Sequence, residues 1–240
     1  MTAARRRAFL LIVAAVAVLA ALAQFAVRSA EPTQERPRLL LLTSLPLVFG
    51  EKFGLEGGSP ALKSLSERYT VVPISTTAPS ELWKASLLMM VHPPAQTPDN
   101  LVALDNWVRG GGRVLLLADP LLEWPSQRPL GDPLRPPPMF PDTGLLAHWN
   151  LKLLAPDRRG LVLLGGGHQP VAFVSPGRLV PEGRDCALSR AGIVADCKIG
   201  KGRAVVVADA DFLNPAIAEL QNPSIHNMVE LQSYLDSLEH

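Results

Sequence analysis

The segment from Ser86 to Pro120 constrains the fold most, because it holds two short apolar runs on either side of an amphipathic stretch. The runs, at 87–91 and 114–118, are too short for most helices, and they are apolar throughout rather than alternating. Between them, Thr97 and the proline after it form a helix start, and apolar residues then recur at helical spacing up to the glycines at 110–112. Strand, helix and strand in this order are typical of a βαβ unit in a parallel sheet that is covered on both faces.

Short apolar runs elsewhere extend this unit into a larger sheet. The runs at 38–44, 69–74 and 204–208 predict further strands of the parallel sheet. Between residues 151 and 199, short strands and tight glycine turns indicate an antiparallel β patch beside it. The segment at 120–141 holds eight prolines and predicts an irregular excursion over the surface, because proline lacks the amide donor of a regular element. The predicted fold class is α/β, with a mostly parallel central sheet and an added antiparallel patch.

An apolar segment near the amino terminus predicts a membrane anchor. Residues 8–27 carry no charge and follow three arginines at 5–7. A helix of this length, at about 1.5 Å per residue, spans about 30 Å, the thickness of the hydrocarbon core of a bilayer. The arginines favour the cytoplasmic side, so a single-pass helix would put the rest of the chain in the periplasm. A cleaved signal peptide is the alternative, since Ala21-Leu22-Ala23 has the small-x-small pattern of a cleavage site.

Either interpretation places the body of the protein outside the cytoplasm and divides the chain into two parts. Residues 1–36 form the predicted membrane anchor and tether, and residues 37–240 form the extracytoplasmic α/β domain. The domain has about 200 residues, which is enough for one sizeable core. Lysine and arginine number 23 against 22 aspartates and glutamates, so no basic surplus indicates a nucleic-acid partner.

Two cysteines fit an oxidising compartment. Cys186 and Cys197 lie on either side of Ala191-Gly192, which has the character of a two-residue hairpin turn. If these two residues form the turn, Cys186 faces Cys197 across the hairpin. We therefore expect a disulfide, which closes a short loop and stabilises the fold by about 2–3 kcal/mol. Two free, buried thiols are the alternative.

Polar side chains follow several of the predicted parallel strands. In a parallel sheet the carboxyl ends of all strands meet at one edge, where ligands commonly bind. The sequence therefore predicts a candidate ligand-binding edge made of Thr43, Ser44, His92, Asp119, Asp209 and Asp211. The alternative is structural, because aspartate and threonine after a strand often cap the next turn or helix.

The same residues limit the chemistry. Two carboxylates spaced as in Asp209-Ala210-Asp211 can bind a divalent cation, and Asp119 could join them in a metal-assisted site. Ser44 lacks the glycine-x-serine-x-glycine frame of a nucleophile elbow. The glycines at 110–112 follow a helix and precede a strand, the reverse of a phosphate-binding loop. We therefore assign no catalytic residue, no metal and no cofactor from the sequence.

Two longer motifs carry a resemblance to a known family. The run LVALDNWVRGGGRVLLLADP at 101–120 and the run GKGRAVVVADADFL at 200–213 resemble the extracytoplasmic domain of GldG-type proteins, auxiliary components of ABC transport systems. The resemblance implies a class I glutamine amidotransferase-like fold, which is a flavodoxin-like three-layer sandwich, preceded here by one N-terminal transmembrane helix. The cysteine and histidine of the amidotransferases have no counterpart in this chain.

Two functions follow as expectations. The first is a non-enzymatic, membrane-anchored periplasmic module that acts as an auxiliary or binding component of an ABC transporter or another envelope complex. The second is a metal-assisted hydrolase with its site at the carboxyl ends of the parallel strands. The discriminating observation is spatial: the three aspartates either converge with His92 in a pocket or cap separate turns.

Overall fold

The computed structural model describes residues 13, 16, 17, 36–48, 59–166, 169–215 and 226–239; for residues 166 and 169 it describes the backbone only. The chain forms two compact units, Met1–Arg36 and Pro37–His240, and all of the β-sheets belong to the second unit. None of the helices in the described ranges has the length and apolar character that crossing a membrane requires. Apart from residues 13, 16 and 17, the predicted span at 8–27 lies outside these ranges.

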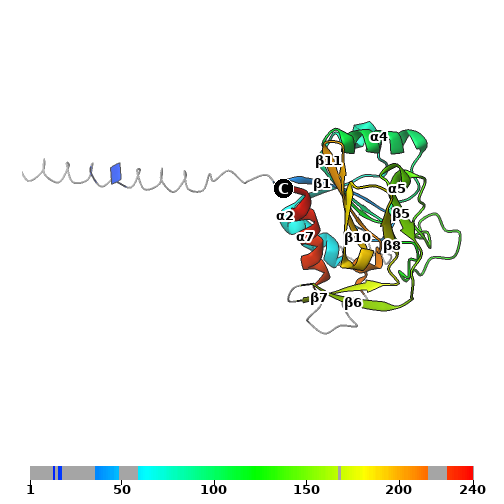
Figure 1. Ribbon diagram of the computed structural model, residues 1–240. Coiled ribbons are helices and arrows are strands. Elements are labelled where there is room, and N and C mark those ends of the chain that lie inside the picture. Colours follow the sequence, from blue (N-terminus) through cyan, green and yellow to red (C-terminus); the bar gives the residue numbers. More distant parts are fainter. Residues whose placement is uncertain are drawn as a thin grey trace, which may run out of the picture. The chain divides into compact units, whose positions relative to one another are not determined.

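A central sheet of seven strands organises the domain (Figure 1). Its order is β2-β1-β3-β4-β11-β10-β9. The first five strands run parallel, and β10 and β9 continue the sheet in antiparallel pairing. Their bounds are β1 Arg38–Thr43, β2 Thr70–Pro73, β3 Leu87–Val91, β4 Arg113–Leu117, β9 Cys186–Ser189, β10 Val194–Ile199 and β11 Gly202–Val207. The predicted α/β class with a mostly parallel sheet is confirmed.

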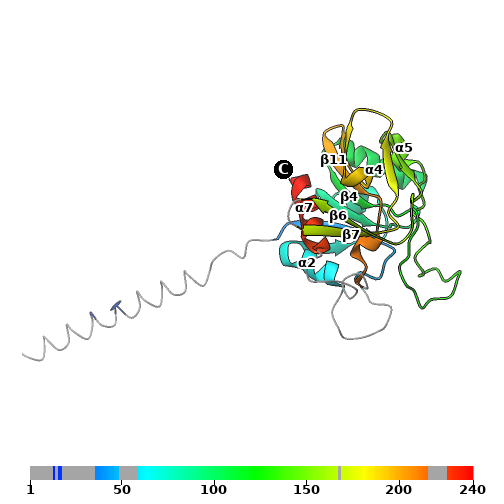
Figure 2. The same ribbon diagram turned by 60° about the horizontal axis from the view of Figure 1, so that its bottom comes forward.

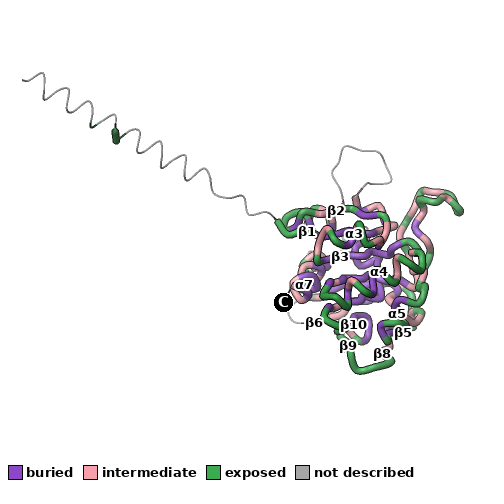
Figure 3. The backbone as a smooth tube through the Cα atoms, turned by 90° about the horizontal axis from the view of Figure 1, so that it is seen from above, coloured by how far each residue is buried: buried purple, intermediate pink, exposed green. Residues whose placement is uncertain are grey.

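Helices cover both faces of this sheet. Helix α2 (Pro60–Arg68) packs with α7 (Asn227–Glu239) on one face, and α3 (Pro79–Leu82) packs with α4 (Pro98–Arg109) on the other (Figures 1 and 3). The predicted start of α4 is confirmed, since the Thr97 side chain accepts a hydrogen bond from the amide of Asn100. Because helices lie on both faces, residues of β1, β3, β4 and β11 are almost fully buried, which explains why these strands are apolar throughout.

The antiparallel part is more divided than the sequence suggests. Besides β9 and β10, two separate two-stranded sheets form, one from β5 (Leu151–Leu154) and β8 (Arg178–Pro181), the other from β6 (Leu161–Gly166) and β7 (Gln169–Val174). Strand β8 escaped prediction, because only two adjacent residues of RLVP are aliphatic and no alternation is visible. Between β4 and the short helix α5 (Leu145–His148) there is no helix or strand, as the prolines at 120–141 predict.

A disulfide joins β9 to β10, as expected. Cys186 and Cys197 are directly opposite in the ladder, with an S–S distance of 2.02 Å. The turn between the strands is the predicted two-residue turn: Ala191 has φ 56° and ψ 30°, Gly192 has φ 87°, and the amide of Ile193 donates to the carbonyl of Arg190. These angles are those of a type I′ turn, which fits the twist of a hairpin.

The motifs at 101–120 and 200–213 lie against each other. Strands β4 and β11 pair in register from Arg113 with Arg203 to Leu117 with Val207. At their amino ends, Gly202 lies so close to the end of α4 that a Cβ atom there would sit 2.1 Å from the carbonyl oxygen of Val108. Glycine is therefore required at this position by close backbone approach, not by turn geometry.

Replacing Gly202 by alanine should lower stability by about 1–3 kcal/mol, because the methyl group has to displace backbone rather than a flexible side chain. Gly165 is the matched control, since a Cβ atom there would have no neighbour within 4 Å. Thermal or urea unfolding of Gly202→Ala and Gly165→Ala measures the difference. Equal unfolding midpoints for the two variants would contradict the packing argument.

Candidate functional site

All six residues of the predicted edge lie just beyond the carboxyl ends of neighbouring parallel strands. Thr43 ends β1 and Ser44 follows it; the other four come after β3, β4 and β11. The register aligns Thr43 with Val91, Val91 with Leu117, and Leu117 with Val207, so the strands end level with one another. The structure divides the six into two groups, one of three aspartates and one of Thr43, Ser44 and His92.

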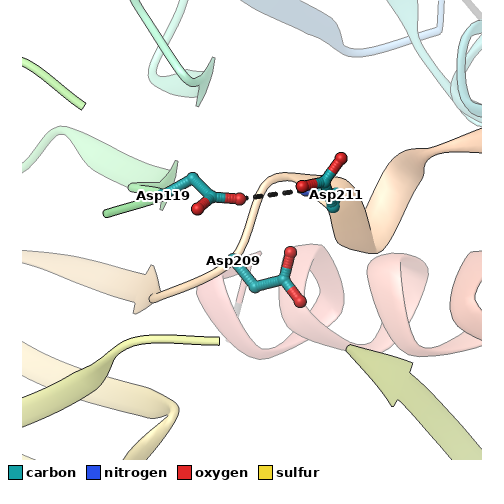
Figure 4. Close-up of side chains that lie close together, drawn as sticks. All are labelled: Asp119, Asp209 and Asp211. Atoms are coloured by element: carbon teal, nitrogen blue, oxygen red, sulfur yellow. Dashed lines mark hydrogen bonds between the residues drawn. The ribbon is translucent and has the colours of Figure 1, made fainter. Parts of the chain in front are cut away.

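The three aspartates converge. Asp119, Asp209 and Asp211 are fully buried, and one carboxylate oxygen from each lies within 4.8 Å of one from each of the others. Asp119 comes from the end of β4, Asp209 from the end of β11, and Asp211 from the short 3₁₀ turn η2 (Asp211–Leu213) that comes next in the chain (Figure 4). Three clustered carboxylates supply the oxygen ligands that a divalent cation takes, so these residues form the candidate metal site of the described part of the chain.

Hydrogen bonds already occupy every oxygen of this cluster. Asp119 accepts from the amides of Leu121 and Ala210, both at 2.8 Å, and from the amide of Asp211 at 3.3 Å. Asp209 accepts from the amides of Val174 at 2.7 Å and Phe212 at 2.9 Å. Asp211 accepts from the amide of Glu123 at 2.6 Å and from the side-chain amide of Asn214 at 3.3 Å. The carboxylates thus tie together the ends of β4, β11 and β7 and the start of the proline-rich segment.

Burial and mutual repulsion favour protonation of the cluster. Burial raises the pKa of Asp119, and burial together with the nearby Asp119 charge raises the pKa of Asp209 well above its usual range. Burial raises the pKa of Asp211 to about 7, and repulsion from Asp119 adds to this rise. Among the hydrogen-bond contacts within the described ranges, none of the three carboxyl groups has a cationic partner. Protonation and hydrogen bonds from backbone amides therefore reduce the repulsion between them.

His92 lies apart from the aspartates and contacts the proline-rich segment. Its ring is fully buried, and Nε2 donates to the carbonyl oxygen of Pro137 at 2.9 Å. Burial lowers the pKa of His92, so the ring is neutral and Nδ1 is its acceptor; that atom is buried without a hydrogen-bond partner within the described ranges. The ring is positioned to hold a loop, and no carboxylate of the described residues orients it as a general base.

Ser44 and Thr43 also serve the backbone. The Ser44 hydroxyl donates to the carbonyl oxygen of His92 at 2.5 Å, which joins the ends of β1 and β3. The Thr43 hydroxyl accepts from the amide of Leu45 at 2.9 Å and fixes the turn after β1. His92 itself has φ 43°, a left-handed conformation that is unusual for a residue other than glycine. The aspartates converge with one another, whereas the hydrogen bonds of Thr43, Ser44 and His92 go to the backbone of other residues.

The edge is covered by the chain's own proline-rich segment, here residues 120–141. This segment returns to the strand ends at two points: Phe140 donates to the carbonyl of Asp119, and Pro137 accepts from His92. The amide of Leu122 donates to the carbonyl of Pro138 and joins the two ends of the segment. Away from these points it projects from the body of the domain (Figure 2). Between these anchored ends it exposes Leu130 and Leu134, which are 87% and 67% exposed, and Met139, which is 58% exposed, lies in the anchored returning part.

Two further residues of this edge were not predicted from the sequence. Glu123 accepts a hydrogen bond from the Ser175 hydroxyl at 2.5 Å, and its amide is the donor to Asp211. Asn227, at the start of α7, holds Ala172 and Phe212 through both atoms of its side-chain amide. Nothing in the local sequence separates Glu123 from other exposed glutamates, because its role depends on contacts with residues 52 and 88 positions away.

Comparisons with known proteins give the fold and no family. No protein-family model matches the chain, and no curated protein sequence matches it. A cytoplasmic protein of Salmonella typhimurium LT2, STM1381, is similar in structure with a TM-score of 0.53 and 11% identity over 84% of this chain and 99% of that one. The exo-β-1,4-mannosidase Op5Man5 of Opitutaceae bacterium strain TAV5 gives a TM-score of 0.51 and 13% identity. This chain covers only 38% of the mannosidase, although the match includes 87% of its own residues.

The titration of the aspartate cluster predicts an unusual pH dependence of stability. Burial raises the pKa of Asp211 from 3.8 to about 7, so between these values the folded protein holds a proton that the unfolded chain releases. The stability due to that proton is present at low pH and is lost as the pH rises through about 7. The melting temperature should therefore fall by several degrees between about pH 5 and about pH 8.

Asp211→Asn should reduce this fall, since asparagine is neutral at every pH; Asp209 and Asp119, whose pKa values are also raised, keep their own share. Asp157→Asn, which changes a carboxylate that is 76% exposed, is the control and should keep the fall. Melting curves of the three proteins in buffers of constant ionic strength test the expectation. A fall of equal size in Asp211→Asn and the wild type would assign the pH dependence to other groups.

Proposed function

We propose that this chain is a non-enzymatic, membrane-anchored module of the periplasm that serves as an auxiliary or binding component of an ABC transport system or another envelope complex. The observation that carries the proposal is the use of the strand-end residues. Every carboxylate oxygen of the aspartate cluster accepts a hydrogen bond from the protein, and His92 holds Pro137, so these groups position a projecting segment. A catalytic edge would leave such groups open to a substrate.

The proline-rich segment is the proposed contact surface. Proline restricts the backbone and lowers the entropy cost of holding a partner-binding conformation. The segment carries Leu130 and Leu134 in solvent between its anchored ends, and exposed apolar groups on a projection are typical of protein contacts. Anchors at its ends and exposed apolar groups between them suit a segment that docks on another protein.

The fold and the proposed location support the same interpretation. The parallel strands follow the order β2-β1-β3-β4-β11, which is the 2-1-3-4-5 order of flavodoxin-like sheets, and helices lie on both faces. We therefore propose the flavodoxin-like, class I glutamine amidotransferase-like sandwich of the GldG-type proteins. The Cys186–Cys197 disulfide supports an oxidising compartment, and the apolar run at 8–27 is the proposed single transmembrane helix, with the amino terminus in the cytoplasm.

The membrane location is tested by extraction of cell membranes with alkaline carbonate. We expect the full-length chain to stay with the membrane fraction, because the apolar run matches the thickness of the bilayer. The disulfide should be intact in mass spectra of non-reduced peptides from the same sample. A shortened, soluble product would instead indicate a cleaved signal peptide and reject the anchor.

The contact surface is tested by affinity purification from solubilised membranes. Replacing Leu130 and Leu134 by serine should reduce the recovery of co-purifying envelope proteins by about tenfold, because buried apolar anchors carry much of an interface's energy. Val102→Ser is the matched control, since Val102 is an exposed aliphatic residue of α4 that is 60% exposed. Unchanged recovery with the Leu130 and Leu134 changes, at normal expression, would reject the segment as the contact surface.

The metal-assisted hydrolase is the second candidate, favoured by the spacing of the three carboxylates alone. The two functions differ in their response to cations. We would add magnesium, calcium, manganese or zinc at millimolar concentration to the wild type and to the Asp209→Asn, Asp211→Asn double variant. Under our proposal, the cations change the melting temperatures of the two proteins equally. A rise of several degrees over chelator-treated protein that is confined to the wild type would favour the hydrolase.

A further inference from the structure

A second, unrelated site lies at the opposite edge of the sheet. A pocket of about 510 Å³ opens where β4 and β11 begin, between these strands, the β9–β10 hairpin and the end of α7. This size is within the range of pockets that take small ligands. Its lining includes five cationic side chains, Arg113, Arg184, Lys198, Lys201 and Arg203, against three acidic ones, Asp185, Asp196 and Glu239.

Two of the arginines belong to the framework of the pocket. Arg203 forms a two-pronged ion pair with Asp196, with N–O distances of 2.7 and 2.5 Å. Arg113 donates to the carbonyl oxygens of Leu238 and Glu239, both at 3.3 Å, and so caps the end of α7. Because these carbonyl partners are neutral, the charge of Arg113 is not cancelled, whereas that of Arg203 is.

The other three cations are available to a ligand. The side chains of Arg184, Lys198 and Lys201 are exposed and form no ion pair or hydrogen bond with the described residues. Of the three acidic residues, Asp196 pairs with Arg203, whereas Glu239 lies 3.6 Å from an Arg68 that already pairs with Asp236. Four cations, counting Arg113, therefore face the two carboxylates of Asp185 and Glu239, and the pocket carries an uncompensated positive charge.

The wall that carries two of these cations is held in place. The Cys186–Cys197 disulfide joins the strand just after Arg184 to the strand that bears Lys198. The amide of Lys198 also donates to the carbonyl of Asp185 at 2.8 Å. On the opposite side, Lys201 is fixed because its amide donates to the carbonyl of Arg109 at 3.0 Å. These bonds fix the backbone positions from which the exposed cationic side chains extend.

We propose that this pocket binds an anionic, phosphate-bearing ligand. Arginine presents a planar fork of donors that matches phosphate oxygens, and lysine adds a compact charge, so one arginine with two lysines suits a diphosphate or a phosphodiester group. The pocket is independent of the proposed function. Both soluble phosphates and phospholipid headgroups carry such a phosphate group, so the experiment has to separate these two sources.

The probe is inorganic pyrophosphate, and the readout is amine acylation of the purified full chain, quantified residue by residue by mass spectrometry. Pyrophosphate should reduce the labelling of Lys198 and Lys201 severalfold and leave Lys152, an exposed lysine of β5, unchanged. Arg184→Ala keeps both reporter lysines and should weaken the pyrophosphate affinity by about tenfold, the loss expected for one charge-assisted contact. Arg159→Ala removes another exposed arginine and should have no effect.

A second arm uses the full chain in phosphatidylcholine vesicles with or without phosphatidylglycerol. Protection of Lys198 and Lys201 by pyrophosphate supports a soluble ligand, and protection that requires phosphatidylglycerol supports a lipid headgroup. Labelling of the two lysines that neither pyrophosphate nor phosphatidylglycerol changes would overturn the proposal. Equal loss of affinity in Arg184→Ala and Arg159→Ala would overturn it as well, because the binding would then be non-specific screening of surface charge.

Discussion

The fold depends on three buried carboxyl groups that accept hydrogen bonds from backbone amides. Asp119 accepts from the amides of Ala210 and Asp211, which fixes the end of β4 to the chain that leaves β11. Asp209 extends the connection to β7 through the amide of Val174. A hydrogen bond contributes about 0.5–1.5 kcal/mol net, more where the acceptor is charged, and leaving a buried polar group without partners costs about 1–3 kcal/mol. The cluster is therefore stable only when β4, β7 and β11 are all in place, so its hydrogen bonds favour this arrangement of strands over others.

This constraint also explains the course of the proline-rich segment. Asp211 accepts from the amide of Glu123, and Glu123 in turn accepts from Ser175, so the first turn of the segment is tied to two other parts of the chain. His92 holds the returning part through Pro137. The prolines cannot contribute regular hydrogen bonds, and the segment has no secondary structure of its own. Its conformation is consequently determined at the strand ends, by side chains that lie before and after it in the chain.

Much of this architecture is readable in the sequence, and the reason is local. Fully apolar runs, cap residues such as Thr97 and the Ala191-Gly192 turn each report on their own conformation, which is why the parallel strands, α4 and the disulfide register were predicted. The sequence does not show which distant residues become hydrogen-bond partners. The aspartates were placed at one edge, but that their oxygens accept amides from Leu121, Val174 and Phe212 depends on contacts between distant segments. Glu123 was missed for the same reason, whereas β8 was missed because RLVP carries no strand pattern of its own.

The two edges of the sheet therefore differ in a way that reverses the usual expectation for such folds. In open α/β sheets the ligand normally sits beyond the carboxyl ends of the strands, where the strand order changes direction, here between β1 and β3. At that point the Ser44 hydroxyl is bonded to the carbonyl of His92, and residues 120–141 cover the edge. The amino-terminal edge is open and carries cations that lack partners among the described residues. Closing the usual edge with the chain's own groups stabilises the fold, and it leaves the opposite edge and the projecting segment as the surfaces on which recognition can act.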